Sequence, residues 1–113
     1  MTTISRDNQL VTIINIFTVN PADQERLISL LTEATQSSVQ HAKGFVSATL
    51  HRSLDGTKVA MYAQWRSLND YQAMREDKTP LPFLLEALSF SGFDPGIYEV
   101  VETFEYSDGG LVS

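Results

Sequence analysis

Residues 45–66 have the sequence FVSATLHRSLDGTKVAMYAQWR, in which two strand-like segments flank a central LDG triplet. An Asp-Gly pair between two segments of alternating apolar residues is the strongest short-range signal for a β-hairpin. The pattern therefore predicts one strand over residues 45–53 and a second over residues 57–66.

The register of this hairpin decides which side chains share a face, because side chains alternate between the two faces of a strand. A two-residue turn at Asp55-Gly56 would place Leu50 opposite Met61. A three-residue loop over residues 54–56 is also chemically reasonable, but it would mix polar and apolar side chains, so binary patterning favours the two-residue turn. That register gathers one apolar face, formed by Val46, Ala48, Leu50, Val59, Met61, Ala63 and Trp65. We therefore expect Trp65 to face the helices and His51 to face away from them.

The chain before the hairpin predicts a strand followed by a helix. Residues 10–19 (LVTIINIFTV) are rich in β-branched side chains and are typical of a buried strand. Asn20 can cap the following helix, and Pro21 suits its first position. Apolar residues then recur at intervals of three and four, and Lys43-Gly44 is a typical helix end.

The chain after the hairpin predicts two helical segments and a last strand. Residues 67–70 (SLND) have the pattern of a capping box and begin the first segment, which residues 77–78 interrupt. A second segment begins at Pro80, has leucines on one face and ends at Gly92. Residues 96–106 then predict the last strand.

The element order strand, helix, strand, strand, helix, strand predicts an α+β fold. It is typical of a ferredoxin-like split β-α-β (βαββαβ) unit, with a four-stranded antiparallel sheet and helices on one face. At 113 residues with 42% apolar residues, the chain predicts a single domain over residues 1–113. We expect an ordered core over about residues 10–106, between an N-terminal tail (1–9) and a mobile polar tail (107–113).

The sheet face opposite the helices needs a cover in this fold. Tyr62, Val100 and Phe104 could supply apolar contacts there, so we expect a homodimer in which two sheets meet face to face. A monomer with a solvated sheet face is the alternative.

Composition excludes several classes of function. Eight basic and fourteen acidic residues give a net charge of −6, which disfavours nucleic acid and anionic membranes as partners. The absence of cysteine excludes disulfides and thiolate chemistry. The polar N-terminus and the lack of a run of ~20 apolar residues predict a cytoplasmic protein. No glycine-rich phosphate loop and no histidine pair at metal spacing occurs, so we expect no metal and no cofactor.

A few polar and aromatic residues within apolar segments are candidates for a site. Trp65 ends a strand and Tyr71 follows in the next helix, so we expect their rings to meet across a dry cleft, although both are also typical core residues. Asn15 interrupts a buried strand, where its amide needs hydrogen-bond partners. His51 and Glu102 are candidate bases, but they equally fit a surface histidine and a charge that protects a sheet edge.

Several segments together carry a family resemblance. They are residues 11–21 (VTIINIFTVNP), 44–46 (GFV), 51–57 (HRSLDGT) and 62–67 (YAQWRS), with Tyr71 following. Over residues 10–106 the chain resembles the antibiotic biosynthesis monooxygenase family of the dimeric α+β barrel superfamily. The resemblance implies a cofactor-independent monooxygenase that uses O2 to oxidise an electron-rich aromatic small molecule, such as an anthrone, phenol or hydroquinone, to a quinone.

The resemblance also implies roles for individual residues. Trp65 and Tyr71 match residues that line the substrate pocket of polyketide oxygenases, and the asparagine expected four residues before the tryptophan is Met61 here. Asn15 matches an asparagine of haem-degrading relatives, but their iron-ligating histidine falls near Arg75, which cannot bind iron.

We therefore expect Trp65, Tyr71 and Asn15 to stabilise a developing oxyanion as the catalytic residues. The expected substrate-binding residues are Leu50, Met61, Phe83 and Leu84. A non-oxidative isomerase or cyclase with the same pocket remains an alternative. A non-catalytic dimeric ligand-binding or scaffold protein is another, and as a scaffold it would lack the ~300 Å³ cavity that a small-molecule site needs.

Overall fold

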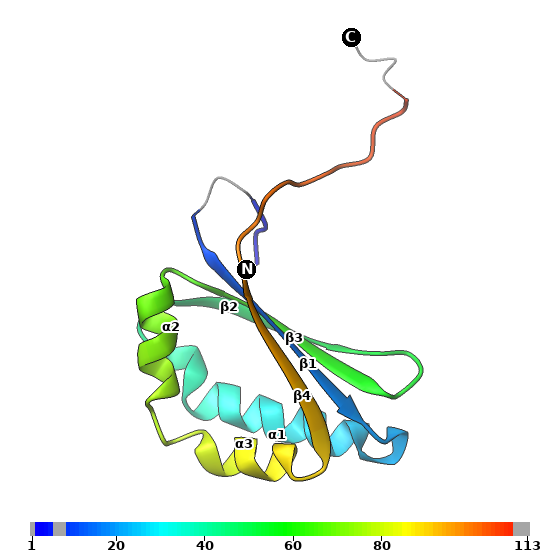
Figure 1. Ribbon diagram of the computed structural model, residues 1–113, viewed down its shortest axis with the longest axis vertical. Helices are drawn as coiled ribbons and strands as arrows, with labels where there is room; N and C mark the ends of the chain where they lie inside the picture. The colour runs from blue at the N-terminus through cyan, green and yellow to red at the C-terminus, as the bar shows by residue number, and fades with distance from the viewer. Residues whose placement is uncertain (1, 6–8, 110–113) are drawn as a thin grey trace.

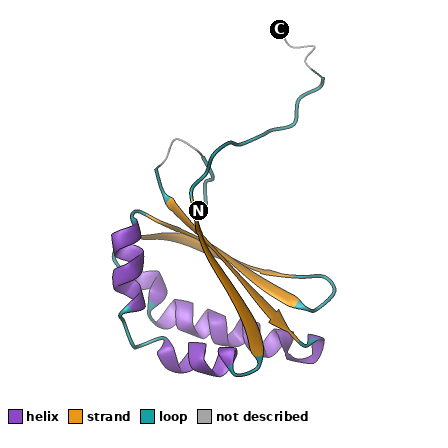
Figure 2. Ribbon diagram, viewed as in Figure 1, coloured by secondary structure: helices purple, strands orange, loops and turns teal. Residues whose placement is uncertain are grey.

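The computed structural model describes residues 2–5 and 9–109 and contains one antiparallel sheet. Its four strands have the order β2-β3-β1-β4. The strands are β1 (Val11–Val19), β2 (Phe45–Arg52), β3 (Lys58–Trp65) and β4 (Ser91–Tyr98). The helices α1 (Gln24–Ser37), α2 (Leu68–Arg75) and α3 (Leu81–Leu88) all lie on one face of this sheet (Figures 1 and 2). The expected ferredoxin-like α+β fold is confirmed.

The hairpin has the expected register but a longer loop. Leu50 pairs with Met61, as the apolar pattern predicts. The backbone N–H of Ser53 donates to the Lys58 carbonyl at 3.0 Å, and that of Gly56 donates to the Ser53 carbonyl at 3.1 Å. The loop therefore spans residues 54–57, and the prediction of a two-residue turn is wrong.

A β-bulge near the start of β2 changes one residue of the predicted apolar face. Phe45 pairs with Trp65, but Ser47 already pairs with Gln64, so Val46 is the extra residue. As a result Phe45, and not Val46, joins the face toward the helices. The Phe45 and Trp65 rings pack edge to face with centroids 5.4 Å apart.

Helix α2 is held at the position that its sequence predicts. The Ser67 hydroxyl accepts a hydrogen bond from the backbone N–H of Asp70 at 3.1 Å, which confirms the predicted cap. Gly44 has a φ of +85°, and a Cβ at this position would overlap the side chain of Asp70. Glycine therefore allows the start of α2 to lie directly against the chain that enters β2.

Helix α1 is shorter than predicted. A single 3-10 turn (Pro21–Asp23) precedes it and another (Val39–His41) follows it, and Asn20 makes no side-chain capping bond. The helix itself ends at Ser37, well before the predicted stop at Lys43-Gly44.

The last strand lies earlier in the chain than predicted. It spans Ser91–Tyr98, whereas residues 99–109 have no regular structure and run away from the sheet (Figure 1). Gly92, the predicted helix end, pairs with Thr18 inside β4. An edge strand tolerates a proline such as Pro95 because one side of its backbone needs no sheet partner. The prediction that Val100 and Phe104 cover the open sheet face is therefore wrong, and Phe104 is 90% exposed.

The N-terminal residues lie against the open face of the sheet. Thr2 Oγ1 donates a hydrogen bond to Ser47 Oγ at 2.9 Å, and Gln64 Nε2 donates to the Thr3 carbonyl at 2.7 Å. Gln64 is only 1% exposed as a consequence. Within the described ranges, no helix is long and apolar enough to cross a membrane. The expected cytoplasmic location stays a prediction.

Candidate active site

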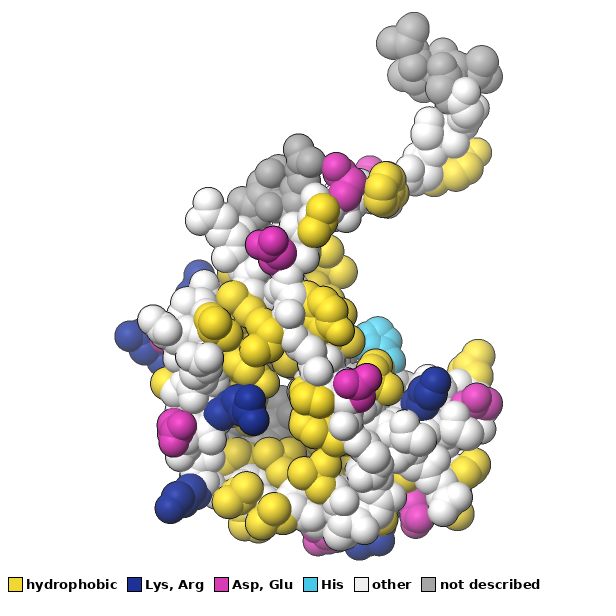
Figure 3. Space-filling view, viewed as in Figure 1, with side chains coloured by type: hydrophobic (Ala, Val, Ile, Leu, Met, Phe, Trp, Pro, Cys, Tyr) yellow, Lys and Arg dark blue, Asp and Glu magenta, His cyan; other side chains and the backbone are white. Residues whose placement is uncertain are grey.

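A cavity of about 310 Å³ lies between the sheet and the helices. In Figure 3 the surface is hollowed between α2, α3 and β4, and hydrophobic side chains surround the hollow. The volume reaches the ~300 Å³ lower limit of a small-molecule site. The filled cleft expected for a scaffold protein is therefore not present.

Residues of all four strands form the floor of this cavity. Asn15 of β1 pairs with Met61 of β3 on one side and with Pro95 of β4 on the other. Side chains at every second position of each strand face the helices. The strand residues that line the cavity are Ile13, Asn15, Phe17, Phe45, Ala48, Met61, Ala63, Trp65, Phe93 and Pro95.

Helix residues close the cavity from the other side. On α3 the leucines recur at helical spacing, and those at 81, 85 and 88 are partly exposed at the cavity mouth. One face of α2 contributes the residues at 71, 74 and 75. These helix residues are Leu31, Ala34, Thr35, Tyr71, Met74, Arg75, Leu81, Leu84, Leu85 and Leu88.

Trp65 and Tyr71 form one aromatic wall of the cavity. Their ring centroids are 5.6 Å apart with an interplanar angle of 65°, and they are 1% and 8% exposed. Both line the cavity as predicted, but they contact each other directly. The expectation that the two rings meet across a hollow is therefore wrong, and a ligand would lie beside this wall.

The polar groups of the wall and the floor have no protein partners. Asn15 Oδ1 is buried without a hydrogen bond. Within the described part of the chain, no hydrogen bond satisfies the Trp65 indole N–H or the Tyr71 hydroxyl. Native proteins satisfy about 90% or more of their buried polar groups. Among the described residues Asn15 Oδ1 is the buried side-chain atom without a partner, whereas the unpaired Trp65 N–H and Tyr71 hydroxyl keep some accessible surface and are open to a ligand in the cavity.

One basic and one acidic side chain lie at the rim of the cavity. The Arg75 guanidinium carbon lies 5.9 Å from the centroid of the Tyr71 ring. Asp77 Oδ2 accepts a hydrogen bond from Ser38 Oγ at 2.6 Å, and Oδ1 accepts one from the Thr79 backbone N–H at 2.9 Å. These bonds lower the pKa of Asp77, so this carboxylate is a weak base.

The chain belongs to the antibiotic biosynthesis monooxygenase family. The sequence profile of that family matches residues 10–78. Tetracenomycin-F1 monooxygenase of Streptomyces glaucescens is 41% identical over 104 residues, which cover 92% of this chain and 93% of that protein. Like that relative, this chain is a monooxygenase, and so an oxidoreductase.

Solved structures share the architecture of this monooxygenase. The monooxygenase ActVA-Orf6 of Streptomyces coelicolor, in complex with nanaomycin D, has a TM-score of 0.71 and 28% identity, covering 88% of this chain and 93% of that one. A variant of SnoaB, a cofactor-independent oxygenase of Streptomyces nogalater, has a TM-score of 0.73 and 24% identity, covering 87% and 99%.

The two candidate bases lie outside the cavity of this monooxygenase. His51 is exposed on the open face of the sheet, where its Nε2 lies 3.0 Å from Thr49 Oγ1. Glu102 lies in the exposed segment after β4. Among the described residues that line the cavity, the titratable ones are Tyr71, Arg75 and Asp77. Within the described lining, none of these three side chains has the chemistry of an efficient base.

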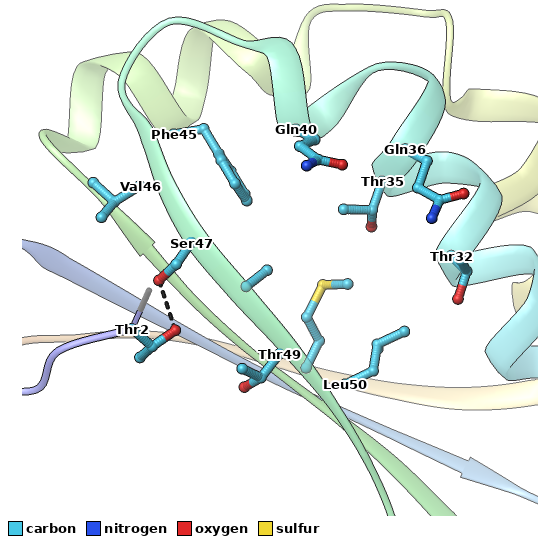
Figure 4. Close-up of a pocket in the computed structure, with 12 residues that line it drawn as sticks. Thr2, Thr32, Thr35, Gln36, Gln40, Phe45, Val46, Ser47, Thr49 and Leu50 are labelled. Carbon is cyan, nitrogen blue, oxygen red and sulfur yellow. Dashed lines mark hydrogen bonds between the residues drawn. The ribbon is translucent and has the colours of Figure 1, made fainter.

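Two of the four expected substrate-binding residues line the cavity of the monooxygenase. Met61 and Leu84 do so, whereas Leu50 and Phe83 do not, and the substrate-binding role of all four stays a prediction. Leu50 lies on the edge strand and lines an adjoining groove of about 550 Å³ beside α1, which shares Met61 with the cavity (Figure 4). Successive helix residues are rotated by roughly 100°, so Phe83 lies on a different side of α3 from Leu84 and does not line the cavity.

Sequence reasoning missed lining residues of two kinds. Met74 and Arg75 follow Tyr71 by three and four residues, so the helical period alone could have identified them. Phe93 and Pro95 could not be found in this way, because the last strand was placed too late in the chain. Among the described residues, no group of three or more potential metal ligands is present.

Proposed function

We propose that this monooxygenase acts without a cofactor and uses O2 to oxidise an electron-rich aromatic, of the anthrone, phenol or hydroquinone type, to a quinone. The observation that carries the proposal is an apolar cavity of about 310 Å³ that is lined by Asn15 and by Trp65 and Tyr71, whose unpaired donor groups are not fully buried. The bound nanaomycin D of the S. coelicolor structure and the name of the S. glaucescens relative support an aromatic substrate.

The chemistry requires a deprotonated substrate and a dry site. Ground-state O2 is a triplet, so a closed-shell carbanion or phenolate first transfers one electron to it. The substrate radical and superoxide then combine to form a carbon–oxygen bond, and the resulting peroxide loses water to leave a carbonyl group. In sum, for an anthrone the CH2 group and O2 give C=O and H2O. Apolar walls protect the radical pair from water.

The three polar groups would stabilise the oxyanion of the deprotonated substrate. The Trp65 indole N–H and the Tyr71 hydroxyl are donors, and the Asn15 amide presents a donor as well as an acceptor. Met61 occupies the position of an asparagine of related oxygenases, but Asn15 is its direct partner across β1 and β3. In this chain the amide is therefore supplied by the neighbouring strand.

The substrate itself would supply much of the acidity. The described cavity lining holds no efficient base, and Asp77 has a lowered pKa. An anthrone or hydroquinone with extended conjugation loses its proton to water at the cavity mouth more readily than a simple phenol does. This reasoning favours polycyclic substrates.

We also propose that the chain acts as a homodimer. The open sheet face presents the half-buried side chains of Ile14, Ile16 and Tyr62 and the half-exposed ring of Tyr98. A second copy could bury these side chains by packing sheet against sheet. Light scattering coupled to gel filtration tests this, and a monomeric mass at micromolar concentration would exclude it.

Oxygen uptake tests the proposed reaction. Purified protein, treated with a chelator and given no flavin, should consume O2 with an anthrone, and product should appear at an equal rate. The variant Trp65→Phe/Tyr71→Phe should lose at least about 10-fold in rate, the lower limit for losing a placed donor. Tyr106→Phe, which alters a ring that is 93% exposed, is the matched control and should retain full activity.

The alternatives predict other results in the same experiment. Conversion of substrate under strict anaerobiosis would indicate an isomerase or cyclase. Saturable binding without turnover would indicate a ligand-binding protein. Unchanged turnover in the double variant would refute the assignment of Trp65 and Tyr71.

A further inference from the structure

Arg75 places a positive charge at the mouth of the apolar cavity. It is the last residue of α2 and, among the described lining residues, the only lysine or arginine. In the space-filling view a basic side chain lies at the edge of the hollow (Figure 3). A cation at the C-terminal end of a helix is favourable in itself. That preference does not explain why this side chain turns toward the cavity.

Arg75 is not neutralised by the protein around it. Arg26 pairs with Glu86 at 3.1 Å, and Arg52 pairs with Glu25. No such pair involves Arg75 within the described part of the chain, and its guanidinium carbon lies 5.9 Å from the centroid of the Tyr71 ring. Its five N–H donors are therefore available to a ligand.

Asp77 is the acidic group at the same rim, but it forms no ion pair with Arg75 within the described part of the chain. Both of its oxygens accept hydrogen bonds, one from the Ser38 hydroxyl and one from the Thr79 backbone N–H. These contacts hold the carboxylate next to the loop between α2 and α3. The rim thus offers a ligand free donors at Arg75 and a carboxylate that is already hydrogen-bonded at Asp77.

We propose that Arg75 binds a carboxylate carried by the aromatic substrate, at a position away from the reacting ring. The inference rests on the proposed function and adds to it the substrate class, an aromatic acid. A guanidinium binds a carboxylate through two parallel hydrogen bonds, which fixes orientation as well as position. The apolar walls would bury the rings, while the anionic group stays at the mouth and avoids the desolvation penalty of a buried charge.

This arrangement gives the substrate a single direction of entry. Asn15 lies on the sheet floor and Arg75 on the rim, so the two hold opposite ends of an elongated molecule. The chain has a net charge of −6, so an anionic substrate gains no long-range attraction from the protein as a whole. The contact with Arg75 must therefore supply the preference for the acid.

A comparison of an acid with its ester tests the inference. An anthrone carboxylate and its methyl ester share the reacting ring and differ in charge. In Arg75→Gln the KM of the acid should rise about 5-fold, near the upper limit for one solvent-exposed ion pair, with kcat unchanged. The KM of the ester should not change, and Arg75→Lys should fall between. Arg66→Gln, an exposed arginine at the end of β3 that does not line the cavity, is the matched control.

Other results would overturn the inference. An equal rise of KM for acid and ester would show that Arg75 acts through its shape. A fall of kcat on both substrates would show that its charge acts on the reacting oxyanion instead.

Binding separates this inference from the proposed reaction. Trp65 is the single tryptophan of the chain and lines the cavity, so its fluorescence reports occupancy without turnover. Naphthoate should quench it at lower concentration than methyl naphthoate in the wild type, and Arg75→Gln should remove the difference. If O2 uptake fails but this difference holds, the proposed reaction is wrong and the carboxylate site stands. If the wild type does not prefer the acid, the carboxylate site is wrong.

Discussion

Replacing Asn15 with leucine is expected to make the protein more stable and less active. The Asn15 Oδ1 atom is buried and has no hydrogen-bond partner, and the cross-strand neighbours of this residue are Met61 and Pro95. An unsatisfied buried acceptor costs roughly 1–3 kcal/mol, whereas an apolar group of similar shape carries no such penalty. Allowing for imperfect packing of the branched side chain, we expect a gain of about 1 kcal/mol.

Thermal unfolding measures this gain. For a domain of this size, 1 kcal/mol corresponds to a rise in Tm of about 4 °C. Melting should be followed by circular dichroism at one protein concentration, because Tm depends on concentration if the chain dimerises. O2 uptake by the same variant should fall at least about 10-fold, because the amide no longer stabilises the oxyanion.

Two further variants test whether the effect comes from the buried amide of Asn15 and not from the introduction of a leucine in general. Asn15→Asp keeps the shape but buries a charge, so its Tm should fall. Asn69→Leu introduces the same side chain at an exposed position of α2 and should change stability by no more than about 0.5 kcal/mol. A lower Tm for Asn15→Leu than for the wild type would refute the view that this amide is held in the cavity at a cost to stability.

Three more variants test other parts of the structure. Gly44→Ala should lose at least about 1 kcal/mol of stability, because the φ of this residue is +85° and the new Cβ meets Asp70. Adding Asp70→Gly to this variant should restore part of the lost stability. An unchanged free energy of unfolding in urea would contradict this geometry. Hydrogen bonds from Thr57 and Ser53 lower the pKa of Asp55 to about 2. These hydrogen bonds to the Asp55 carboxylate therefore contribute their full stability above the unfolded pKa of about 4, and this stability is lost as the pH falls through about 2. Asp55→Asn should therefore lower the urea midpoint at pH 7 but not near pH 2, and an equal loss at both values would exclude this explanation. Phe93→Ala removes a ring whose centroid lies 5.0 Å from that of Phe17, so it should cost about 1 kcal/mol and raise KM more than it lowers kcat.

The elements that could be predicted are those that carry their own local signal. The hairpin register follows from the alternation of apolar residues around Asp55-Gly56, and the Ser67 cap follows from its spacing to Asp70. Trp65 and Tyr71 could be placed in one cavity because a strand end and the next helix turn must lie together. Each of these inferences needs only residues close in sequence.

The features that could not be predicted depend on distant partners. Strand β4 contains Gly92, Pro95 and Gly96, which disfavour a strand by local preference, yet β1 pairs with it over its whole length. The bulge at Val46 is likewise set by the pairing with β3. Because β4 was misplaced, the wall that Phe93 and Pro95 contribute to the cavity was also missed.

Asn15 shows how these two kinds of information combine in the site. Its sequence context already indicates a misplaced polar group in a buried strand, but the sequence does not say what satisfies it. The fold places Met61 and Pro95 beside it, and neither of these side chains has a hydrogen-bond donor for the carbonyl oxygen of Asn15. The strand pairing that completes the sheet therefore leaves the Asn15 Oδ1 atom buried and without a partner at the floor of the cavity.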